Sequence, residues 1–361
     1  MKPIIFKIDI NSPSLPHRKH IKFLMKLEEF GGVSYRHIMR KMHAEIKKTI
    51  NHSGGKLAKS DNLGIGWSGR TPKIELDLNG KVSRVIEKYA EGLRWILIGD
   101  AAGEEAIAIA KEVGIFNRMP KGILTSAYMD AVESQSDYFE QIFGSEPKFS
   151  SSLQEQAIQD VIGNSNRYLD EIVAKLRNDI INSITAAQSA VNMMNTLSIG
   201  EKAFEMIKDL GAREALINAS KSGLQNISDN RLNNAIRKPI KDFSTRWDTA
   251  VVGEVGLASG AAAYRTMTDV YAGRDEGGVK VCNITMEDSK VCEFCYQISF
   301  DADGNYHVYR LSDINPVGYN RGKKRAEWKI AVPAHHPHCR CSLVYVPSGF
   351  KVLKGGLIEP E

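Results

Sequence analysis

The strongest constraint on the fold is the position of the cysteines, because all five lie between Cys282 and Cys341 of a 361-residue chain. Cys292 and Cys295 form a C-x-x-C pair (CEFC), and about forty residues later the segment 335–341 (HHPHCRC) holds three histidines and two cysteines. An odd number of cysteines in a large chain without a secretion signal favours a metal site over a disulfide framework. The C-terminal region is therefore expected to fold around a metal ion.

The spacing of these residues favours zinc. A C-x-x-C pair places two thiolates on one turn, which suits the tetrahedral geometry of Zn²⁺, and the second cluster supplies two more ligands. The predicted ligands are drawn from Cys292, Cys295, His336, Cys339 and Cys341. His336 is preferred as the fourth ligand because it stands three residues before Cys339, whereas Cys341 would complete a four-cysteine site. The alternatives are reduced thiols without a metal, or a disulfide of the Cys292–Cys339 type.

A structural role is expected for this zinc ion. A catalytic zinc keeps one coordination position open and usually has an acid or base beside it. Glu293, inside the C-x-x-C pair, is the acidic residue nearest to the predicted ligands. The loop between the two clusters has few large apolar residues, so an ion that holds it together is physically reasonable.

The charge of the chain is concentrated at one end. Residues 1–60 contain 13 Lys or Arg against four acidic residues, a net charge of +9, whereas the whole chain carries +5. Such a segment suits phosphates or an acidic protein surface, and it also suits a solvated helix face. No stretch approaches the ~20 apolar residues of a membrane-spanning helix, and the first ten residues do not have the form of a secretory signal.

Hydrophobic periodicity predicts a mainly helical chain. Strands are expected over 5–10, 73–78, 279–284, 308–311 and 343–346, with a polar loop over 51–69. Helices are expected as two segments within 18–50, and then over 83–99, 103–113, 124–143, 166–194, 202–210 and 229–272. Gly31-Gly32 is expected to separate the first two, and an interruption is expected near Pro239. Gly114 is the expected C-cap of 103–113, and a capping box at 198–201 precedes 202–210. The motif G-x-G-x-x-G at 64–69 is interpreted as a loop, because polar residues precede it and a strand pattern follows.

The expected fold class is mainly α with a small, β-containing, zinc-stapled C-terminal region, α+β overall. The segment 144–152 (GSEPKFSSS) has the composition of a linker. After Gly273 the sequence pattern changes from helical to short strands joined by turns. Three regions are therefore expected: a basic N-terminal region of mixed strands and helices over 1–150, a helical region over 151–273, and a Cys/His zinc-binding knob with short strands over 274–361.

The two Cys/His segments also carry a family resemblance. Residues 288–295 (DSKVCEFC) and 333–341 (PAHHPHCRC) resemble the head morphogenesis domain of tailed-phage minor head proteins, the phage Mu F-like family. That domain has an acidic residue before a C-x-x-C pair, then proline and H-P-x-C-R-C. The resemblance covers about residues 150–346. Cys282 stands where such domains more often have a bulky aromatic residue, so it is not expected to bind the metal.

The resemblance implies a virion structural protein, not an enzyme, that is assembled in the host cytoplasm and takes part in head assembly, DNA packaging or ejection. The implied partners are the portal protein, other head or neck proteins, and packaged DNA through residues 1–60, with no membrane. Two alternatives come from other classes: a metal-dependent nuclease or other enzyme, and a zinc-containing nucleic-acid-binding protein. Within residues 1–150 no pair of carboxylates, Ser-His-Asp order or phosphate loop stands out as a catalytic set, and no recognition helix is evident between the two clusters.

Overall fold

The structure is a computed structural model of the chain. It describes residues 8–9, 12, 15–60, 71–118, 121–148, 151–198, 210–271, 278–285, 291–315, 320, 323–332, 335, 339, 341–353 and 356–360. Within these ranges it describes the backbone alone at 51–60, 71–77, 118, 151–153, 187–198 and 210–235.

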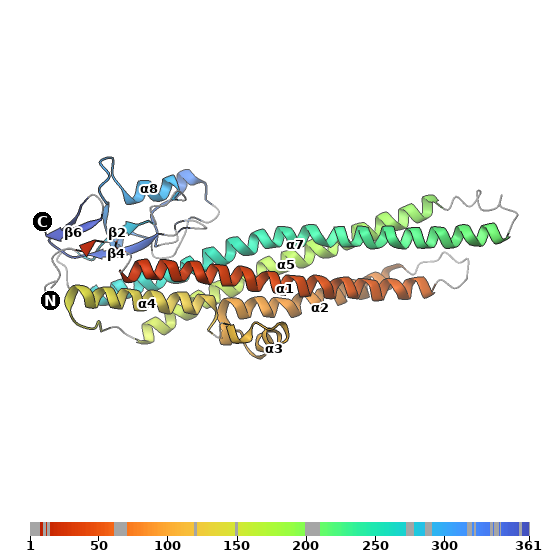
Figure 1. The fold of residues 1–361 in the computed structure, drawn as a ribbon, viewed down its shortest axis with the longest axis horizontal. Coiled ribbons are helices and arrows are strands. Elements are labelled where there is room, and N and C mark those ends of the chain that lie inside the picture. Colours follow the sequence, from red (N-terminus) through yellow and green to blue (C-terminus); the bar gives the residue numbers. More distant parts are fainter. Residues whose placement is uncertain are drawn as a thin grey trace. The chain divides into compact units, whose positions relative to one another are not determined.

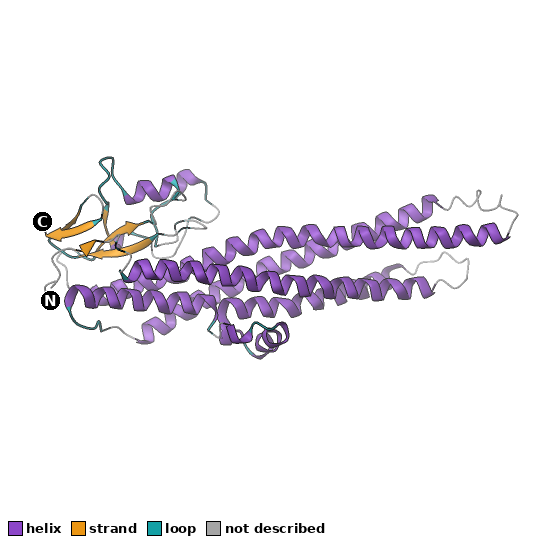
Figure 2. Cartoon of the chain, in the orientation of Figure 1, coloured by secondary structure: helices purple, strands orange, loops and turns teal. Residues whose placement is uncertain are grey.

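Helices account for most of the described residues (Figures 1 and 2). They are α1 (Pro16–Ser60), α2 (Thr71–Ile98), α3 (Glu104–Val113), α4 (Gly122–Phe143), α5 (Ser151–Ser198), α7 (Leu210–Tyr271) and the short α8 (Glu293–Ser299). The strands are β1 (Ile8–Asp9), β2 (Lys280–Ile284), β3 (Val308–Arg310), β4 (Ser342–Val346), β5 (Phe350–Val352) and β6 (Leu357–Pro360). The predicted fold class, mainly α with small antiparallel strands in the C-terminal region, is confirmed. Among the described helices, none is long and apolar enough to cross a bilayer.

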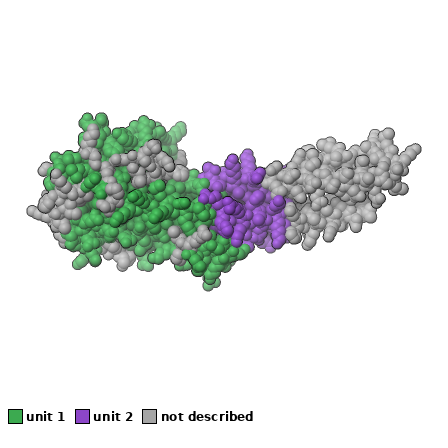
Figure 3. Space-filling model, in the orientation of Figure 1, with its two compact units in different colours: residues 1–35, 94–168, 247–361 green, residues 36–93, 169–246 purple. Residues whose placement is uncertain are grey.

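The chain divides into two compact units, each built from segments that are far apart in the sequence (Figure 3). Unit 1 comprises Met1–Tyr35, Arg94–Tyr168 and Trp247–Glu361, and unit 2 comprises Arg36–Leu93 and Leu169–Arg246. Each unit combines separate segments of the chain, whereas the boundaries expected near 150 and 273 divide the chain into consecutive regions. Those boundaries stay a prediction.

Unit 2 is made of helix segments whose apolar residues recur every three or four positions. In the α2 segment Leu78, Val82, Val85, Ile86 and Tyr89 are buried, and in the α5 segment Leu169, Leu176, Ile180 and Ile184 are buried. This is the pattern of a helix that buries one face. The α5 stripe was predicted from the sequence; its last members, 187–194, lie outside the described side chains.

Three expectations about these helices are wrong. Gly31-Gly32 does not separate two helices, since α1 runs from Pro16 to Ser60 and includes part of the expected loop. Residues 73–78 belong to α2 and not to a strand, because the helical period of the following residues extends over that short alternation. Pro239 lies inside the continuous helix α7, where the buried Ile236 and Phe243 on either side hold the helix in place.

Gly31 has a packing role in unit 1. A Cβ atom at this position would lie 2.9 Å from Cγ1 of Val251, so the glycine allows α1 and α7 to approach closely. Glycine costs a helix about 1 kcal/mol relative to alanine, and burial against a neighbouring helix offsets this cost. The capping box expected at 198–201 and the helix at 202–210 fall almost entirely outside the described residues, as does the loop at 64–69.

The C-terminal region of unit 1 forms two small antiparallel sheets. One has the order β3-β2-β4, and the other has the order β1-β6-β5, in which the N-terminal strand pairs Ile8 with Ile358. The strands predicted at 279–284, 308–311 and 343–346 are thus present within one or two residues, and β5 and β6 were not predicted. The expected N-terminal strand is confirmed at Ile8–Asp9, and its other residues lie outside the described part.

One apolar core joins the strands of unit 1 to its helices. It contains Phe139 and Phe143 of α4, Tyr271 at the end of α7, and Tyr345 of β4. The rings of Tyr271 and Tyr345 stack at a centroid distance of 3.7 Å, and the Tyr138 hydroxyl donates a hydrogen bond to the Tyr345 carbonyl. The sheet that leads to the cysteines is therefore fixed on the helices of the same unit.

Two glycines in unit 1 allow a matched test of this packing. Gly122, at the start of α4, has φ +69°, and a Cβ there would lie 2.6 Å from Cα of Ile98. Gly114, the C-cap of α3, has φ +80° with no atom within 4 Å of such a Cβ. Gly114→Ala is expected to cost about 1 kcal/mol from backbone strain alone. Gly122→Ala is expected to cost about 3 kcal/mol, because a backbone clash is added to the strain.

Urea unfolding of the two variants and the unchanged chain measures these free energies. Equal losses for Gly122→Ala and Gly114→Ala would contradict the close approach of α4 to the end of α2.

Candidate metal centre

Three cysteine thiols meet in the C-terminal region of unit 1. The Sγ atoms of Cys295, Cys339 and Cys341 all lie within 4.8 Å of one another, and all three side chains are buried. Sγ of Cys295 is 3.9 Å from Sγ of Cys339, far beyond the roughly 2.05 Å of a disulfide bond. The three thiols thus form no disulfide with one another and lie within metal-binding distance.

Cys292 supplies a fourth sulfur at the edge of this cluster. It is the N-cap residue of α8, and its Sγ accepts a hydrogen bond from the Cys295 backbone N–H at 3.4 Å. Its partly buried side chain packs against the three clustered thiols. The predicted C-x-x-C turn is therefore present, with both sulfurs on the first turn of a short helix.

The pairing of β2 with β4 explains why the two cysteine segments meet. The strands are antiparallel, and Ile284 at the end of β2 faces Ser342 at the start of β4. β2 therefore ends where β4 begins. The chain runs on from β2 toward Cys292, and the segment with Cys339 and Cys341 precedes β4 at the same end of the sheet. Residues more than forty positions apart are thereby brought to one end of a single sheet.

The protonation of these thiols depends on their neighbours. Hydrogen bonds with Cys339 and Cys341, together with burial, raise the pKa of Cys295 far above its usual range. A thiolate is therefore unfavourable in this cluster unless a positive charge compensates it. A bound cation would supply that charge, since metal-ligating cysteines bind as thiolates.

His335 lies beside the cluster, but both of its ring nitrogens have protein partners. Nδ1 accepts a hydrogen bond from the Ala331 backbone N–H at 3.4 Å, and Nε2 lies 3.1 Å from Oδ1 of Asn283. The residue has no exposed surface. His335 is therefore not available as a ligand. The predicted ligand His336 and its neighbour His338 lie outside the described residues, so the role of His336 stays a prediction.

Cys282 occupies a different environment. It lies in β2 within the apolar core, with no exposed surface, and burial raises the pKa of its thiol to about 12. It is not a member of the three-thiol cluster. An inert buried thiol of this kind behaves as a small apolar side chain.

Sequence reasoning missed the polar residues around the thiols. Asn283 is fully buried in β2, where it contacts His335 and donates a hydrogen bond from Nδ2 to Oγ of Ser299 at 2.6 Å. Asn320 donates hydrogen bonds to the His335 carbonyl from its backbone N–H and from its side chain. The only indication in the sequence was an asparagine within an apolar strand (VCNI), because a buried amide needs partners.

A chain of hydrogen bonds with Asp, His and Ser members occurs elsewhere in unit 1. His20 Nδ1 contacts Asp130 Oδ2, and His20 Nε2 lies 2.6 Å from Oγ of Ser259. Ser259 is buried inside α7, where the surrounding backbone N–H groups belong to the helix ladder and cannot form an oxyanion hole. We assign the network to linking α1, α4 and α7.

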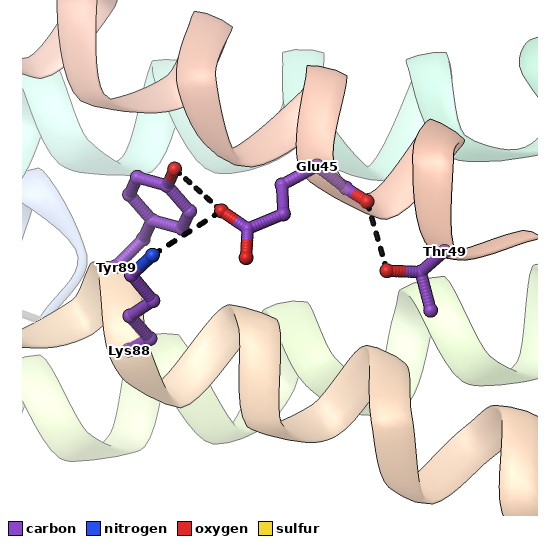
Figure 4. A network of polar contacts seen from close by, with 4 residues as sticks. All are labelled: Glu45, Thr49, Lys88 and Tyr89. Atoms are coloured by element: carbon purple, nitrogen blue, oxygen red, sulfur yellow. Dashed lines mark hydrogen bonds and ion pairs between the residues drawn. The ribbon is translucent and has the colours of Figure 1, made fainter.

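Polar contacts in unit 2 are also interhelical links. Glu45 Oε2 accepts hydrogen bonds from the Tyr89 hydroxyl at 2.8 Å and from Lys88 Nζ at 3.4 Å, and Thr49 Oγ1 donates to the Glu45 carbonyl (Figure 4). The Glu45 and Lys88 side chains are about one-third exposed. The contacts join α1 to α2.

Comparison with known proteins gives no relative from which a function could be transferred. No protein-family model, no curated protein and no solved structure matches this chain.

Proposed function

We propose that the cysteine cluster binds one structural Zn²⁺ ion through Cys292, Cys295, Cys339 and Cys341. The 3.9 Å between the sulfurs of Cys295 and Cys339 supports this proposal. Four sulfurs at a Zn–S distance of about 2.3 Å form a tetrahedron with edges of roughly 3.8 Å. The position of Cys341 in the cluster favours it over His336 as the fourth ligand.

Burial and charge favour a structural ion over a catalytic one. The exposed fractions are 3%, 8% and 9% for Cys295, Cys339 and Cys341, so water has little access to the sulfurs. The side chain of Glu293 is 69% exposed, and its carboxylate accepts a 2.7 Å hydrogen bond from Arg325. The acid inside the C-x-x-C pair is thus exposed and paired with Arg325, which argues against its use in a metal-dependent nuclease.

The zinc proposal predicts that protein purified under reducing conditions contains about one zinc ion per chain. Cys339→Ser is expected to abolish zinc binding and to lower the melting temperature strongly, because the free energy of binding contributes to folding. Cys282→Ala is the matched control: it should retain the zinc and lose about 1–2 kcal/mol, as an ordinary core substitution does.

Elemental analysis and thermal unfolding measure both effects. A metal-free protein with unchanged thermal stability would refute the structural zinc.

We further propose that the chain is a minor head protein of a tailed phage, associated with the portal and acting in head assembly. The observation that carries this proposal is the resemblance of residues 288–295 and 333–341 to the head morphogenesis domain. Cysteines from both segments, Cys295 with Cys339 and Cys341, lie together in one cluster. The motif residues thus belong to a single site, as a shared structural element requires.

The exposed face of α1 supports a partner of negative charge. Its exposed basic side chains recur at helical spacing: Lys19, Lys22, Lys26, Arg36, Arg40, Lys47 and Lys48. Among the described side chains of α1, Glu29 is the one exposed acidic residue. A row of cations along one helix suits an acidic portal surface or the phosphates of packaged DNA.

The head proposal predicts a late defect in the phage. Deletion of the gene should give defective or non-infectious heads, while early gene expression and replication proceed. A chain with Lys19→Glu, Lys22→Glu and Lys26→Glu should fold with normal stability and yet be incorporated into particles poorly, because the charge of the α1 face is reversed. The matched control is Lys111→Glu and Lys121→Glu, two exposed changes outside α1.

Quantification of the chain in purified particles decides the outcome. Infectious particles with no detectable copy of the chain would contradict the proposal and favour an enzyme or a zinc-containing nucleic-acid-binding protein.

A further inference from the structure

We propose that Asn283 and His335 are positioning residues that hold the cysteine ligands in place before the metal binds. The inference rests on the proposed zinc site and adds to it a set of residues that bind no metal. It concerns the affinity of the site, because ligands that are already in position lose less conformational freedom when the ion binds.

Asn283 connects three parts of the site from within β2. One amide hydrogen is donated to Oγ of Ser299, at the end of α8. Oδ1 of the same amide faces His335 Nε2 at 3.1 Å. One donor and the acceptor of the amide are thus used in a fully buried position. The residue ties the end of α8, the helix capped by Cys292, to the segment at His335 that precedes Cys339.

His335 connects the second cysteine segment to the first. It stands four residues before Cys339, and its ring contacts Phe294, which lies between Cys292 and Cys295, at a centroid distance of 6.0 Å. Nδ1 accepts from the Ala331 N–H, so in the neutral ring Nε2 carries the proton and donates to Asn283. The imidazole is therefore held in one tautomer and one orientation by two different segments.

Asn320 fixes the backbone of His335 in turn. It donates to the His335 carbonyl from its backbone N–H at 3.2 Å and from Nδ2 at 3.0 Å. Its side chain also exchanges hydrogen bonds with Lys329, accepting from the N–H and donating to the carbonyl, each at 2.9 Å. The Asn320 side chain thus holds Lys329 and His335 close to each other through hydrogen bonds that do not involve the thiols.

This arrangement matches the role of outer-shell groups in metal proteins, which orient the ligands and whose loss typically weakens metal binding by about 10–100-fold. A positioning role also explains why both ring nitrogens of His335 have protein partners, Ala331 and Asn283. A histidine that bound the metal would have one ring nitrogen facing the position of the ion between the sulfurs.

The test compares zinc affinity in full-length variants. His335→Phe retains a ring against Phe294 and removes both ring hydrogen bonds, and Asn283→Ser removes the central amide. Each is expected to weaken zinc binding by about 10–100-fold in competition with a chromophoric chelator. His307→Phe is the matched control: the partly exposed His307 contacts Ser299 through its backbone N–H alone, which the substitution retains, and its change should leave the affinity within about twofold.

Cobalt(II) substitution separates positioning from ligation. In His335→Phe the sulfur-to-cobalt absorption of the unchanged chain should persist, because the thiolate ligands remain the same. A variant that fails to fold at saturating zinc is replaced by Ser299→Ala, a smaller change that removes one partner of Asn283 and should weaken binding by about tenfold.

The outcomes are distinguishable from failure of the zinc site itself. Loss of metal in Cys339→Ser with unchanged affinity in His335→Phe and Asn283→Ser would overturn the positioning role alone. An altered cobalt spectrum in His335→Phe would also overturn it, by making His335 a ligand. An unchanged chain that binds no zinc would overturn both proposals.

Discussion

The antiparallel pairing of β2 with β4 is the interaction on which the C-terminal region depends. It sets five residue pairs from Lys280–Val346 to Ile284–Ser342, and all five β4 residues are buried. This ladder closes a loop of almost sixty residues, and closing a loop costs conformational entropy that rises slowly with its length. A cross-link at the mouth of the loop would offset part of that cost, and the cysteines lie at that end of the sheet.

The same two strands also connect the candidate metal centre to the helices. Tyr345 stacks on Tyr271 at the end of α7, and Arg18 in the first turn of α1 donates a 2.7 Å hydrogen bond to the Thr285 carbonyl just beyond β2. Both contacts are buried and lie within unit 1. One face of the sheet is thus held by apolar packing, and one end by the polar network of Asn283 and His335. An ion bound there would complete a region whose frame is already in place.

Sequence reasoning succeeded where the information is local. The end of α3 follows from Gly114, which adopts the left-handed conformation and donates its N–H to the last carbonyls of the helix. The buried face of α5 follows from its period, and the C-x-x-C turn follows from its spacing. Each of these depends on residues within a few positions of one another.

Features that depend on tertiary contacts were not accessible from the sequence. Gly31 and Pro239 are poor helix residues in isolation, yet packing keeps α1 and α7 continuous through them. The pairing of β1 with β6 joins the two ends of the chain. Spacing favoured His336 over His335 as a ligand, but the sequence did not show that the ring nitrogens of His335 contact Ala331 and Asn283.

The most direct test of the central claim is X-ray absorption spectroscopy at the zinc edge on the full-length protein loaded with one equivalent of Zn²⁺. The account predicts a shell of four sulfur atoms at about 2.3 Å with no bound water, as expected for a closed structural site. A shell with fewer than four sulfurs, or one that includes a water oxygen, would contradict it.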